Sequence, residues 1–454
     1  MSDGQETVGE VVDRIPVGRF HWMLIATMGG FWAAQGVAVL GISFVLPTLI
    51  DVWNLSGFTA GVLGSASLFG MIVGNTLGGR YADQFGRKGT MIATIVMFSV
   101  FTAATALATG LYSAVAFRFL TGIGLGGSLV AGVSYLTEYL PTDSRGRFIT
   151  LLEAFFSVGS LVTVVLAWVV FSKLGADGAI LGVAPWRVFF ALGLFPVIFA
   201  VVVYYMPESP YYLAESGKMD AAASGLASLA SSNDGDPESI PSELAVSDTP
   251  DVGFRRLFDG DLRGTTILMT SLWFGLNLAY YGIFTWLPNT VEAAGYVGSL
   301  YRYLFVVAVF QLTGQLLAAY LIEAIGRKWT LGIYLLLSGG ATFLFAAVIS
   351  SGTSVSGNEL LFRVGLYAMG FALFGAWAVL YAYTSEIFPT KVRSTGLGFT
   401  GSIGKVAATA GPIVFGTLAE FGYLVALAPV ATLLFVIGIA LITFGRETRG
   451  ETLT

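Results

Sequence analysis

At residues 79–88 the chain reads Gly79-Arg-Tyr-Ala-Asp83-Gln-Phe-Gly86-Arg87-Lys88, a charged stretch between two long apolar runs. A second version, Ala319-Tyr-Leu-Ile-Glu323-Ala-Ile-Gly326-Arg327-Lys328, lies 240 positions later and again separates two apolar runs. The acid, the glycine, the arginine and the lysine keep their order. A repeat at this distance in a chain of 454 residues predicts two halves with the same design.

The composition indicates a membrane protein. Hydrophobic residues make up 55% of the chain, charged residues only 11%, and the mean hydropathy is +0.78, whereas a soluble domain carries roughly 25% charged residues. The 58 glycines favour close packing of helices in lipid. The absence of cysteine excludes disulfides, thiolate metal sites and a cysteine nucleophile. The single histidine, His21, stands where the first apolar run begins, and we expect it to be an interfacial residue and not a ligand.

Twelve apolar runs follow one another along the chain. Each is long enough to cross about 30 Å of hydrocarbon as a helix that rises about 1.5 Å per residue. The predicted spans are residues 20–47, 60–79, 90–109, 112–136, 148–172, 186–206, 265–289, 301–322, 329–350, 361–383, 396–418 and 424–445. We therefore expect an all-α membrane protein with twelve transmembrane helices, arranged as two pseudo-symmetric six-helix bundles.

The longest connection divides the spans six and six. The expected parts are a cytoplasmic tail (1–19), an N-terminal bundle (20–206), a cytoplasmic linker (207–264), a C-terminal bundle (265–445) and a cytoplasmic tail (446–454). Within the linker, Ala214 to Ala230 could form a short helix on the membrane surface. Ser231 to Pro250 is rich in Ser, Asp, Glu, Gly and Pro, which is typical of a flexible segment. A small folded domain is disfavoured at this length and composition.

The positive charges fall mainly on one side of the predicted spans. Of 23 Lys and Arg residues, all but six lie in the two tails or in the connections on the tails' side. Cytoplasmic loops carry an excess of Lys and Arg. We therefore predict a multi-pass protein of the cell membrane with both termini in the cytoplasm.

Two further pairs of stretches repeat between the halves. Glu138-Tyr-Leu-Pro141-Thr-Asp-Ser-Arg145-Gly146 is matched 248 positions later by Glu386-Ile-Phe-Pro389-Thr-Lys-Val-Arg393. Pro207-Glu208-Ser209-Pro210 is matched 239 positions later by Arg446-Glu447-Thr448-Arg449. All of these stretches fall on the predicted cytoplasmic side, which makes chance a poor explanation.

Over essentially all twelve spans the chain resembles the major facilitator superfamily, in which two six-helix halves are related by an axis along the membrane normal. Arg118 with Gly122, Gly124 and Gly126, the stretches 141–146 and 207–213, and the tail 449–453 resemble the sugar porters. The stretches 153–159 and 280–288 are more similar to the branch of niacin, organic-ion and synaptic-vesicle-glycoprotein relatives.

The resemblance implies that the charged repeats form a network that closes the cytoplasmic side in the outward-facing state. The residues assigned to this predicted cytoplasmic gate are Asp83, Arg87, Lys88, Glu138, Arg145, Glu208, Glu323, Arg327, Glu386, Arg393 and Glu447. Exposed ion pairs contribute only about 0–1 kcal/mol each, which suits a contact that must open. The alternative is that the acids are solvated and that the bases are there only to set the topology.

Charges inside spans are costly and are functional candidates by default. Arg118 lies about 30 Å above the inner end of its span, and its counterpart in the other half is Leu366. The resemblance to proton-coupled sugar porters implies a partner acid on the first span, but residues 31–43 contain none, and Gln35 is the nearest polar group in type and depth. Arg118 and Gln35 are therefore candidates for substrate binding, and Arg118 also for proton coupling. The alternative is an arginine that reaches the outer interface or bonds to helix carbonyls.

Glu153 and Lys405 are the other two charges inside spans. They lie about 12 and 18 Å from the inner ends of their spans, and their counterparts are Gly401 and Ser157. A buried carboxylate with few partners can exchange protons near neutral pH, so Glu153 is our main candidate for proton coupling. The resemblance implies a sugar-binding Gln at the place of Glu153 and a cation for anionic substrates at the place of Lys405. The alternatives are an ion pair of Glu153 with Arg147 and a lysine satisfied by backbone carbonyls.

Amides and aromatic rings complete the predicted substrate site. Gln311 and Gln315 are four residues apart and share a helix face. The further candidates are Asn277, Tyr280, Tyr281, Trp377 and Tyr381. Amides suit hydroxyl groups and rings suit a flat aromatic acid. The alternative is that these rings contact only lipid or other helices.

We predict a secondary transporter for a small organic solute, an organic or aromatic carboxylate carried with protons, that works by alternating access. The alternatives are a sugar or polyol symporter or facilitator and a non-transporting membrane receptor. A drug/proton antiporter is disfavoured because the fifth span lacks a Gly-Pro-rich motif. An enzyme is disfavoured because the chain has one His, no Cys, no nucleophile-elbow motif and no metal-binding cluster, and ATP drive is disfavoured by the lack of a phosphate-binding loop. We expect a monomer in the lipid bilayer with no cofactor, metal or nucleic acid.

Overall fold

The computed structural model describes residues 6–175, 178–241, 244–245, 254–260, 262–295, 300–351, 355–389 and 392–449. Within these residues the chain is helical and forms no strand. Twelve helical segments are long and apolar enough to cross a membrane. The prediction of an all-α protein with twelve transmembrane helices is confirmed.

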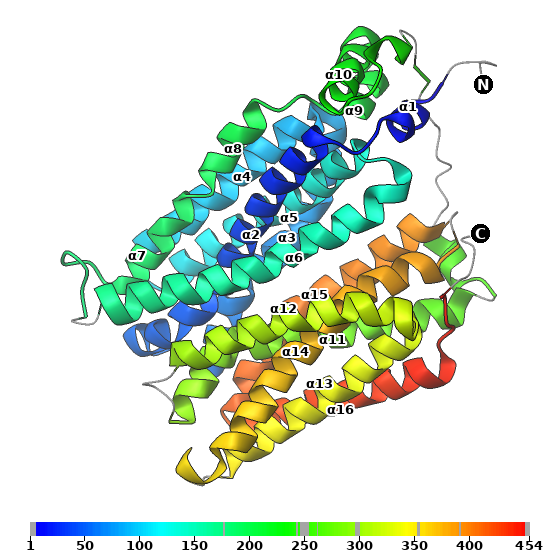
Figure 1. Cartoon of the computed structure of the whole chain (residues 1–454). Helices are drawn as coiled ribbons and strands as arrows, with labels where there is room; N and C mark the ends of the chain where they lie inside the picture. The colour runs from blue at the N-terminus through cyan, green and yellow to red at the C-terminus, as the bar shows by residue number, and fades with distance from the viewer. Residues whose placement is uncertain are drawn as a thin grey trace.

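The first six spans form the N half, which lies in the upper part of Figure 1. Its helices are α2 (Arg19–Trp53), α3 (Gly57–Phe85), α4 (Arg87–Ala104), α5 (Leu111–Glu138), α6 (Thr142–Ala167) and, for the sixth span, α7 (Pro185–Ala191) with α8 (Val197–Tyr204). The last six spans form the C half. Its helices are α11 (Leu262–Ala293), α12 (Leu300–Ala324), α13 (Arg327–Ser350), α14 (Val355–Ile387), α15 (Arg393–Ala419) and α16 (Tyr423–Phe444).

Both described chain ends lie on one face of the molecule (Figure 1). We call this the terminal face, where α2 begins and α16 ends, and the other the opposite face, where α3 begins and α15 ends. The halves contact each other through α3 with α15, α6 with α12 and α2 with α11. In Figure 1, α6 and α12 lie closest near the opposite face and diverge toward the terminal face.

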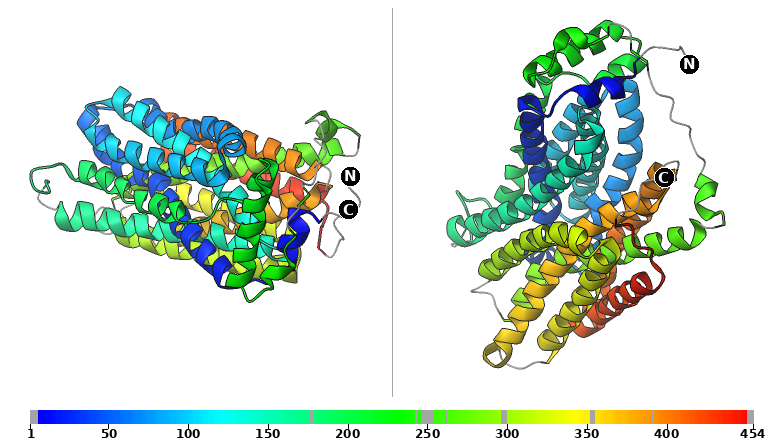
Figure 2. Two further views of the ribbon diagram at one scale, coloured as in Figure 1. Left: turned by 90° about the horizontal axis from the view of Figure 1, so that it is seen from above. Right: turned by 45° about the vertical axis from the view of Figure 1, so that its right-hand side comes forward.

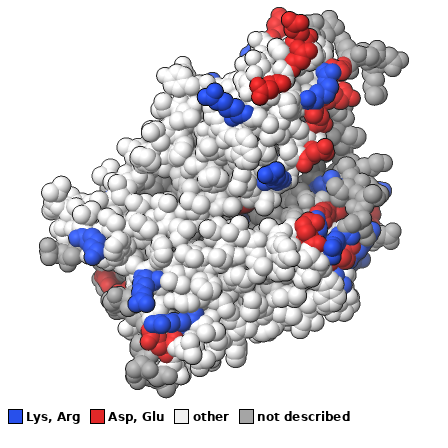
Figure 3. All heavy atoms as spheres, in the orientation of Figure 1, with Lys and Arg blue, Asp and Glu red and all other residues white. Residues whose placement is uncertain are grey.

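Charged residues are concentrated at the terminal face and the opposite face (Figure 3). Figure 3 shows Lys, Arg, Asp and Glu gathered at the two ends of the molecule, with a belt almost free of charge between them. A belt of this kind matches the apolar slab of a bilayer. The protein is therefore a multi-pass membrane protein.

Glycine allows the helices of the N half to approach closely. Gly70, Gly74 and Gly78 recur every four residues on one face of α3, and a Cβ at each would overlap the backbone of α5. Small residues at such a crossing allow backbone contact in lipid. Proline does not end the spans, since α2 continues through Pro47 and α11 through Pro288. The first predicted span was therefore too short at its C-terminal end.

The polar segments on the terminal face carry more structure than the sequence indicated. The tail contains α1 (Val8–Arg14), and the linker contains α9 (Pro210–Glu215) and α10 (Met219–Ser232). These three helices lie together beyond the helix ends of the N half (Figures 1 and 2). The predicted surface helix falls where α9 and α10 lie. Residues 242–243 and 246–250 of the predicted flexible segment lie outside the described residues, as do residues 1–5, 251–253, 261 and 450–454 of the predicted tails and linker.

His21 lies in the first turn of α2, at the end of the span as expected, but it is buried within the protein and not exposed at the interface. Its Nε2 lies 2.8 Å from the carbonyl oxygen of Tyr139, and its Nδ1 lies 3.1 Å from the amide nitrogen of Asn233. The burial arises because α10 ends over the start of α2. The histidine therefore joins the linker to the N half.

Candidate functional site

The first charged repeat folds into a compact cluster around Arg87. This arginine begins α4, and its Nε donates to Glu138 at the end of α5 at 2.9 Å. Its guanidinium also lies 3.5 Å from Asp83 at the end of α3 and 3.5 Å from Glu215 of α9. The hydroxyl of Ser209 donates to the second oxygen of Glu138. We call these five residues the Arg87 cluster.

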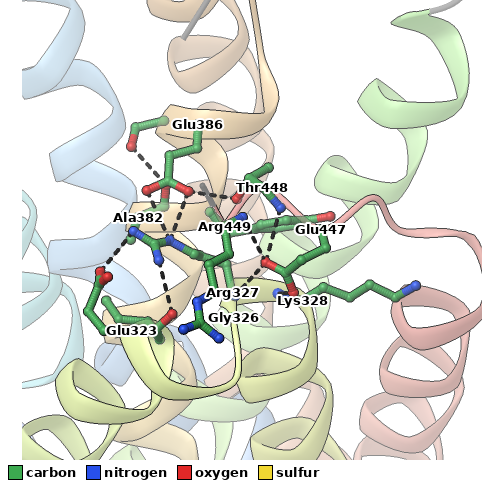
Figure 4. Close-up of polar contacts among 12 residues, drawn as sticks. Glu323, Gly326, Arg327, Lys328, Ala382, Glu386, Glu447, Thr448 and Arg449 are labelled. Atoms are coloured by element: carbon green, nitrogen blue, oxygen red, sulfur yellow. Dashed lines mark hydrogen bonds and ion pairs between the residues drawn. The ribbon is translucent and has the colours of Figure 1, made fainter. Parts of the chain in front are cut away.

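The second repeat builds the same arrangement in the C half (Figure 4). Arg327 begins α13, and its Nε lies 2.9 Å from Glu386 at the end of α14. It also pairs with Glu323 of α12 at 2.9 Å, and the hydroxyl of Thr448 donates to Glu386 at 2.6 Å. We call these four residues the Arg327 cluster. The repeat in sequence is thus a repeat of side-chain contacts.

A further acid in each half caps the helix that the arginine begins. The carboxylate of Glu208 accepts from the backbone N–H of Lys88 at 3.0 Å, and that of Glu447 accepts from the N–H of Arg327 at 2.8 Å. A carboxylate at a helix N-terminus is stabilised by the helix dipole. Gly86 and Gly326 precede these helices with φ of 90° and 97°, and a Cβ at either position would collide with the capping carboxylate. The glycine of the motif is therefore required by the cap.

The ion pairs of the two clusters join helices of the same half, apart from the pair of Arg87 with Glu215 on the linker helix α9, and none of them joins the two halves. The other predicted gate bases have different contacts. The ammonium of Lys88 lies over the ring of Tyr204, and Arg145 donates to the carbonyl of Leu140 at 2.9 Å. Arg393 begins α15 at the terminal face. In this conformation the clusters tie helix ends together within each half.

The two charges Glu153 and Lys405 face each other across the boundary between the halves. Glu153 lies on α6 and Lys405 on α15. The negative charge of Glu153 and the positive charge of Lys405 attract each other. Within the described residues, no ion pair at hydrogen-bonding distance joins the two charges. Trp32 of α2 approaches the carboxylate of Glu153, and Tyr281 and Tyr381 of the C half lie within its electrostatic range. This group is the candidate substrate site.

Aromatic rings form the C-half side of this site. The rings of Trp377 and Tyr381 on α14 stack at 5.8 Å, and the ring of Trp273 on α11 meets both edge-on. Tyr280 packs against Trp377 and Tyr281. A wall of this kind can take the face of a flat ring.

Two tryptophans of this site were missed by sequence reasoning. Trp32 stands three residues before Gln35, and Trp273 four residues before Asn277, so each shares a helix face with a predicted site residue. That spacing was the available signal. Asn277 itself is buried and donates to the carbonyl of Trp273 at 2.7 Å, along its own helix.

Gln311 and Gln315 form hydrogen bonds across the boundary between the halves. Gln315 accepts from Ser157 at 2.6 Å, and Gln311 accepts from Ser160 at 2.9 Å. These bonds join α12 to α6. A small cavity of about 30 Å³ lies next to Gln311 on the side of the opposite face and is lined mainly by apolar side chains of α2, α6, α11 and α12. The two amides thus hold the halves together in this conformation.

Arg118 and Gln35 lie inside the N half. The guanidinium of Arg118 is fully buried, donates to the carbonyl of Ala38 and to the hydroxyl of Ser67 at 2.9 and 3.0 Å, and lies over the ring of Phe190. Gln35 donates to Ser128 at 3.2 Å. The two side chains bond to different partners, and the structure does not bring Arg118 to the group around Glu153.

Over nearly its whole length the chain is similar to known transporters. Residues 22–454 match the sugar (and other) transporter family. The chain is 33% identical over 450 residues to the niacin transporter of Acinetobacter baylyi, covering 97% of this chain and 98% of the relative. It is 31% identical over 439 residues to a putative niacin/nicotinamide transporter of Bacillus subtilis, covering 96% and 98%. The inward-open structure of the xylose transporter of E. coli superposes with a TM-score of 0.72 at 21% identity, covering 96% and 98%. The chain therefore belongs to the sugar (and other) transporter family of the major facilitator superfamily.

Proposed function

We propose that this protein is a secondary transporter that carries a small aromatic carboxylate together with protons across the cell membrane by alternating access. The observation that carries the proposal is the pair Glu153 and Lys405. These two opposite charges face each other from different halves, beside a wall of aromatic rings. A solute bound there touches both halves, which is what an alternating-access site requires.

Lys405 supplies the positive charge for the substrate carboxylate. Its ammonium interacts with Glu153 but is not locked in a hydrogen-bonded pair within the described residues, so a substrate carboxylate can take that interaction. The rings of Trp273, Trp377 and Tyr381 are placed to stack on an aromatic substrate. The niacin transporter among the relatives supports this substrate class, since niacin is an aromatic carboxylic acid.

Glu153 is the proposed proton site. When the substrate carboxylate binds Lys405, the negative charge of Glu153 loses its nearby counter-charge, and an unpaired buried carboxylate is stabilised by taking up a proton. Substrate and proton then bind together, which is the behaviour of a symporter.

We place the terminal face in the cytoplasm because it carries the excess of Lys and Arg. The conformation is then inward-facing, with the halves in contact near the outside. In the outward-facing state the two clusters meet across the halves and form the cytoplasmic gate. The protein acts as a monomer, because one chain holds both halves of the site.

Uptake of a labelled aromatic acid tests the proposal. Purified protein in liposomes is expected to accumulate labelled nicotinate under an inward proton gradient. Lys405→Ala is expected to lower the affinity for the acid at least tenfold, because a charge-assisted hydrogen bond contributes about 1.5–3 kcal/mol. Lys173→Ala is the matched control, since Lys173 lies at the opposite-face end of its span, over Trp168. Unchanged affinity in Lys405→Ala would refute the role of this lysine.

A second variant separates coupling from binding. Glu153→Gln keeps the size of the side chain but cannot lose or gain the proton. We expect it to retain exchange of labelled acid between two sides at equal pH and to lose accumulation above equilibrium. Accumulation equal to that of the parent protein would show that another group couples the protons.

A sugar or polyol transporter is the second candidate, favoured by the amides of Gln311 and Gln315 at the boundary between the halves. A thermal-shift screen with sugars and organic acids distinguishes the two, since a ligand that binds only the folded protein raises its apparent stability. Saturable binding without any uptake would indicate a receptor.

A further inference from the structure

The halves approach each other most closely near the opposite face, where α3 crosses α15. Gly57 begins α3, and a Cβ there would overlap the carbonyl of Gly416 on α15. Gly61, one turn further along α3, faces the backbone of Pro412 in the same way. The two backbones are in direct contact over more than a helical turn, with no side chain between them.

At the end of this contact a carboxylate of one half caps a helix of the other half. Glu420 follows the last residue of α15, and its Oε1 accepts from the backbone N–H of Gly57 at 2.6 Å. The first N–H groups of a helix have no partner within the helix and lie at its positive end. A hydrogen bond between such an N–H and a carboxylate is charge-assisted and stronger than a neutral one.

This bond differs in kind from the other described side-chain hydrogen bonds across the halves. The bonds from Ser157 and Ser160 to the glutamines are neutral. The ion pairs at the terminal face stay within one half. Within the part of the chain that the structure describes, Glu420 therefore supplies a charged hydrogen bond between the halves at the opposite face, and this bond must break when that face opens.

We propose that Glu420 is the latch of the opposite face, a positioning residue that sets how often the substrate site opens on that side. The inference rests on the proposed alternating access. While the latch is made, α3 and α15 stay joined and the path from the opposite face to the site is closed. When it breaks, the N-terminus of α3 is solvated and the halves can separate there.

Cysteine labelling tests the latch directly, because the chain contains no cysteine of its own. Thr285 of α11 is buried and its methyl group faces Gly64 of α3 across the boundary, so Thr285→Cys reports on opening of the opposite face. The measured quantity is the rate at which a membrane-impermeant maleimide labels this cysteine in right-side-out vesicles. We expect Glu420→Gln or Glu420→Ala, each combined with Thr285→Cys, to raise this labelling rate about three- to tenfold. The increase is of this size because the bond that is lost is charge-assisted but partly solvated.

Glu359→Gln is the matched control. Glu359 lies at the start of α14 on the same face, but its partners Tyr303 and Arg363 belong to the C half. The labelling rate of this variant is expected to stay at the parent value. An unchanged rate in both Glu420 variants, with an unfolding temperature equal to that of the parent, would overturn the latch.

Uptake of labelled nicotinate is measured in parallel, so that the two proposals fail separately. Faster labelling with no uptake of any solute by any variant would leave the latch standing and remove the proposed transport function. Uptake by the parent with equal labelling rates would remove the latch alone.

Discussion

The Arg87 and Arg327 clusters share one skeleton, in which an arginine at a helix start binds a glutamate at a helix end. The Nε–carboxylate distance is 2.9 Å in both. The surroundings differ. The side chains of Arg87 and Glu138 are 9% and 14% exposed, whereas those of Arg327 and Glu386 are 14% and 22% exposed. The pair in the N half is thus better shielded from solvent.

The extra shielding in the N half comes from α9. This helix supplies Glu215, the third acid of the Arg87 cluster, and the ring of Tyr212, which lies 5.6 Å from the guanidinium. The hydroxyl of Tyr212 also donates to the carbonyl of Gln84 at 3.2 Å. The duplicated skeleton is therefore a property of the transmembrane helices, and the difference between the halves is a property of the linker.

Removal of each arginine tests this difference most strongly. Breaking a buried ion pair from one side is destabilising by about 3–5 kcal/mol, because a buried charge is left alone. We expect Arg87→Ala to lower stability by about 3 kcal/mol and Arg327→Ala by about 2 kcal/mol, since both pairs are partly exposed. The measurement is thermal unfolding of the purified protein in detergent.

The adjacent lysines provide matched controls. The ammonium groups of Lys88 and Lys328 lie over the rings of Tyr204 and Trp329 and not within the clusters. Lys88→Ala and Lys328→Ala are each expected to change stability by less than about 1 kcal/mol. A larger loss from Arg327→Ala than from Arg87→Ala would contradict the role given to α9.

The fold could be predicted well because several independent features of the sequence indicated the same arrangement. Twelve long apolar runs, the uneven distribution of Lys and Arg and three repeated charged stretches all indicated the same arrangement. The packing of α1, α9 and α10 was not predictable. Their contacts, such as that between His21 and Asn233, join residues 212 positions apart, and no periodicity marks them.

The candidate site was predicted less completely. Depth along a helix placed Glu153, Lys405 and Arg118 inside the membrane, but depth does not tell which side of a helix faces the other half. Glu153 and Lys405 come together across the boundary, whereas Arg118 is enclosed within the N half. Trp32 and Trp273 were overlooked because, in a chain that is 14% aromatic, one ring gives little information by itself.

The contribution of the third acid is the smallest effect that distinguishes the clusters. Glu215 is 45% exposed and lies 3.5 Å from Arg87, so the pair is solvated and contributes about 0.5 kcal/mol or less. Glu215→Gln is expected to lower stability by that amount, with Glu323→Gln in the C half as the matched control, since Glu323 is also an exposed acid beside its arginine. A loss in Glu215→Gln as large as that in Arg87→Ala would mean that the linker, and not the duplicated arginine–glutamate pair, holds the helix ends of the N half together.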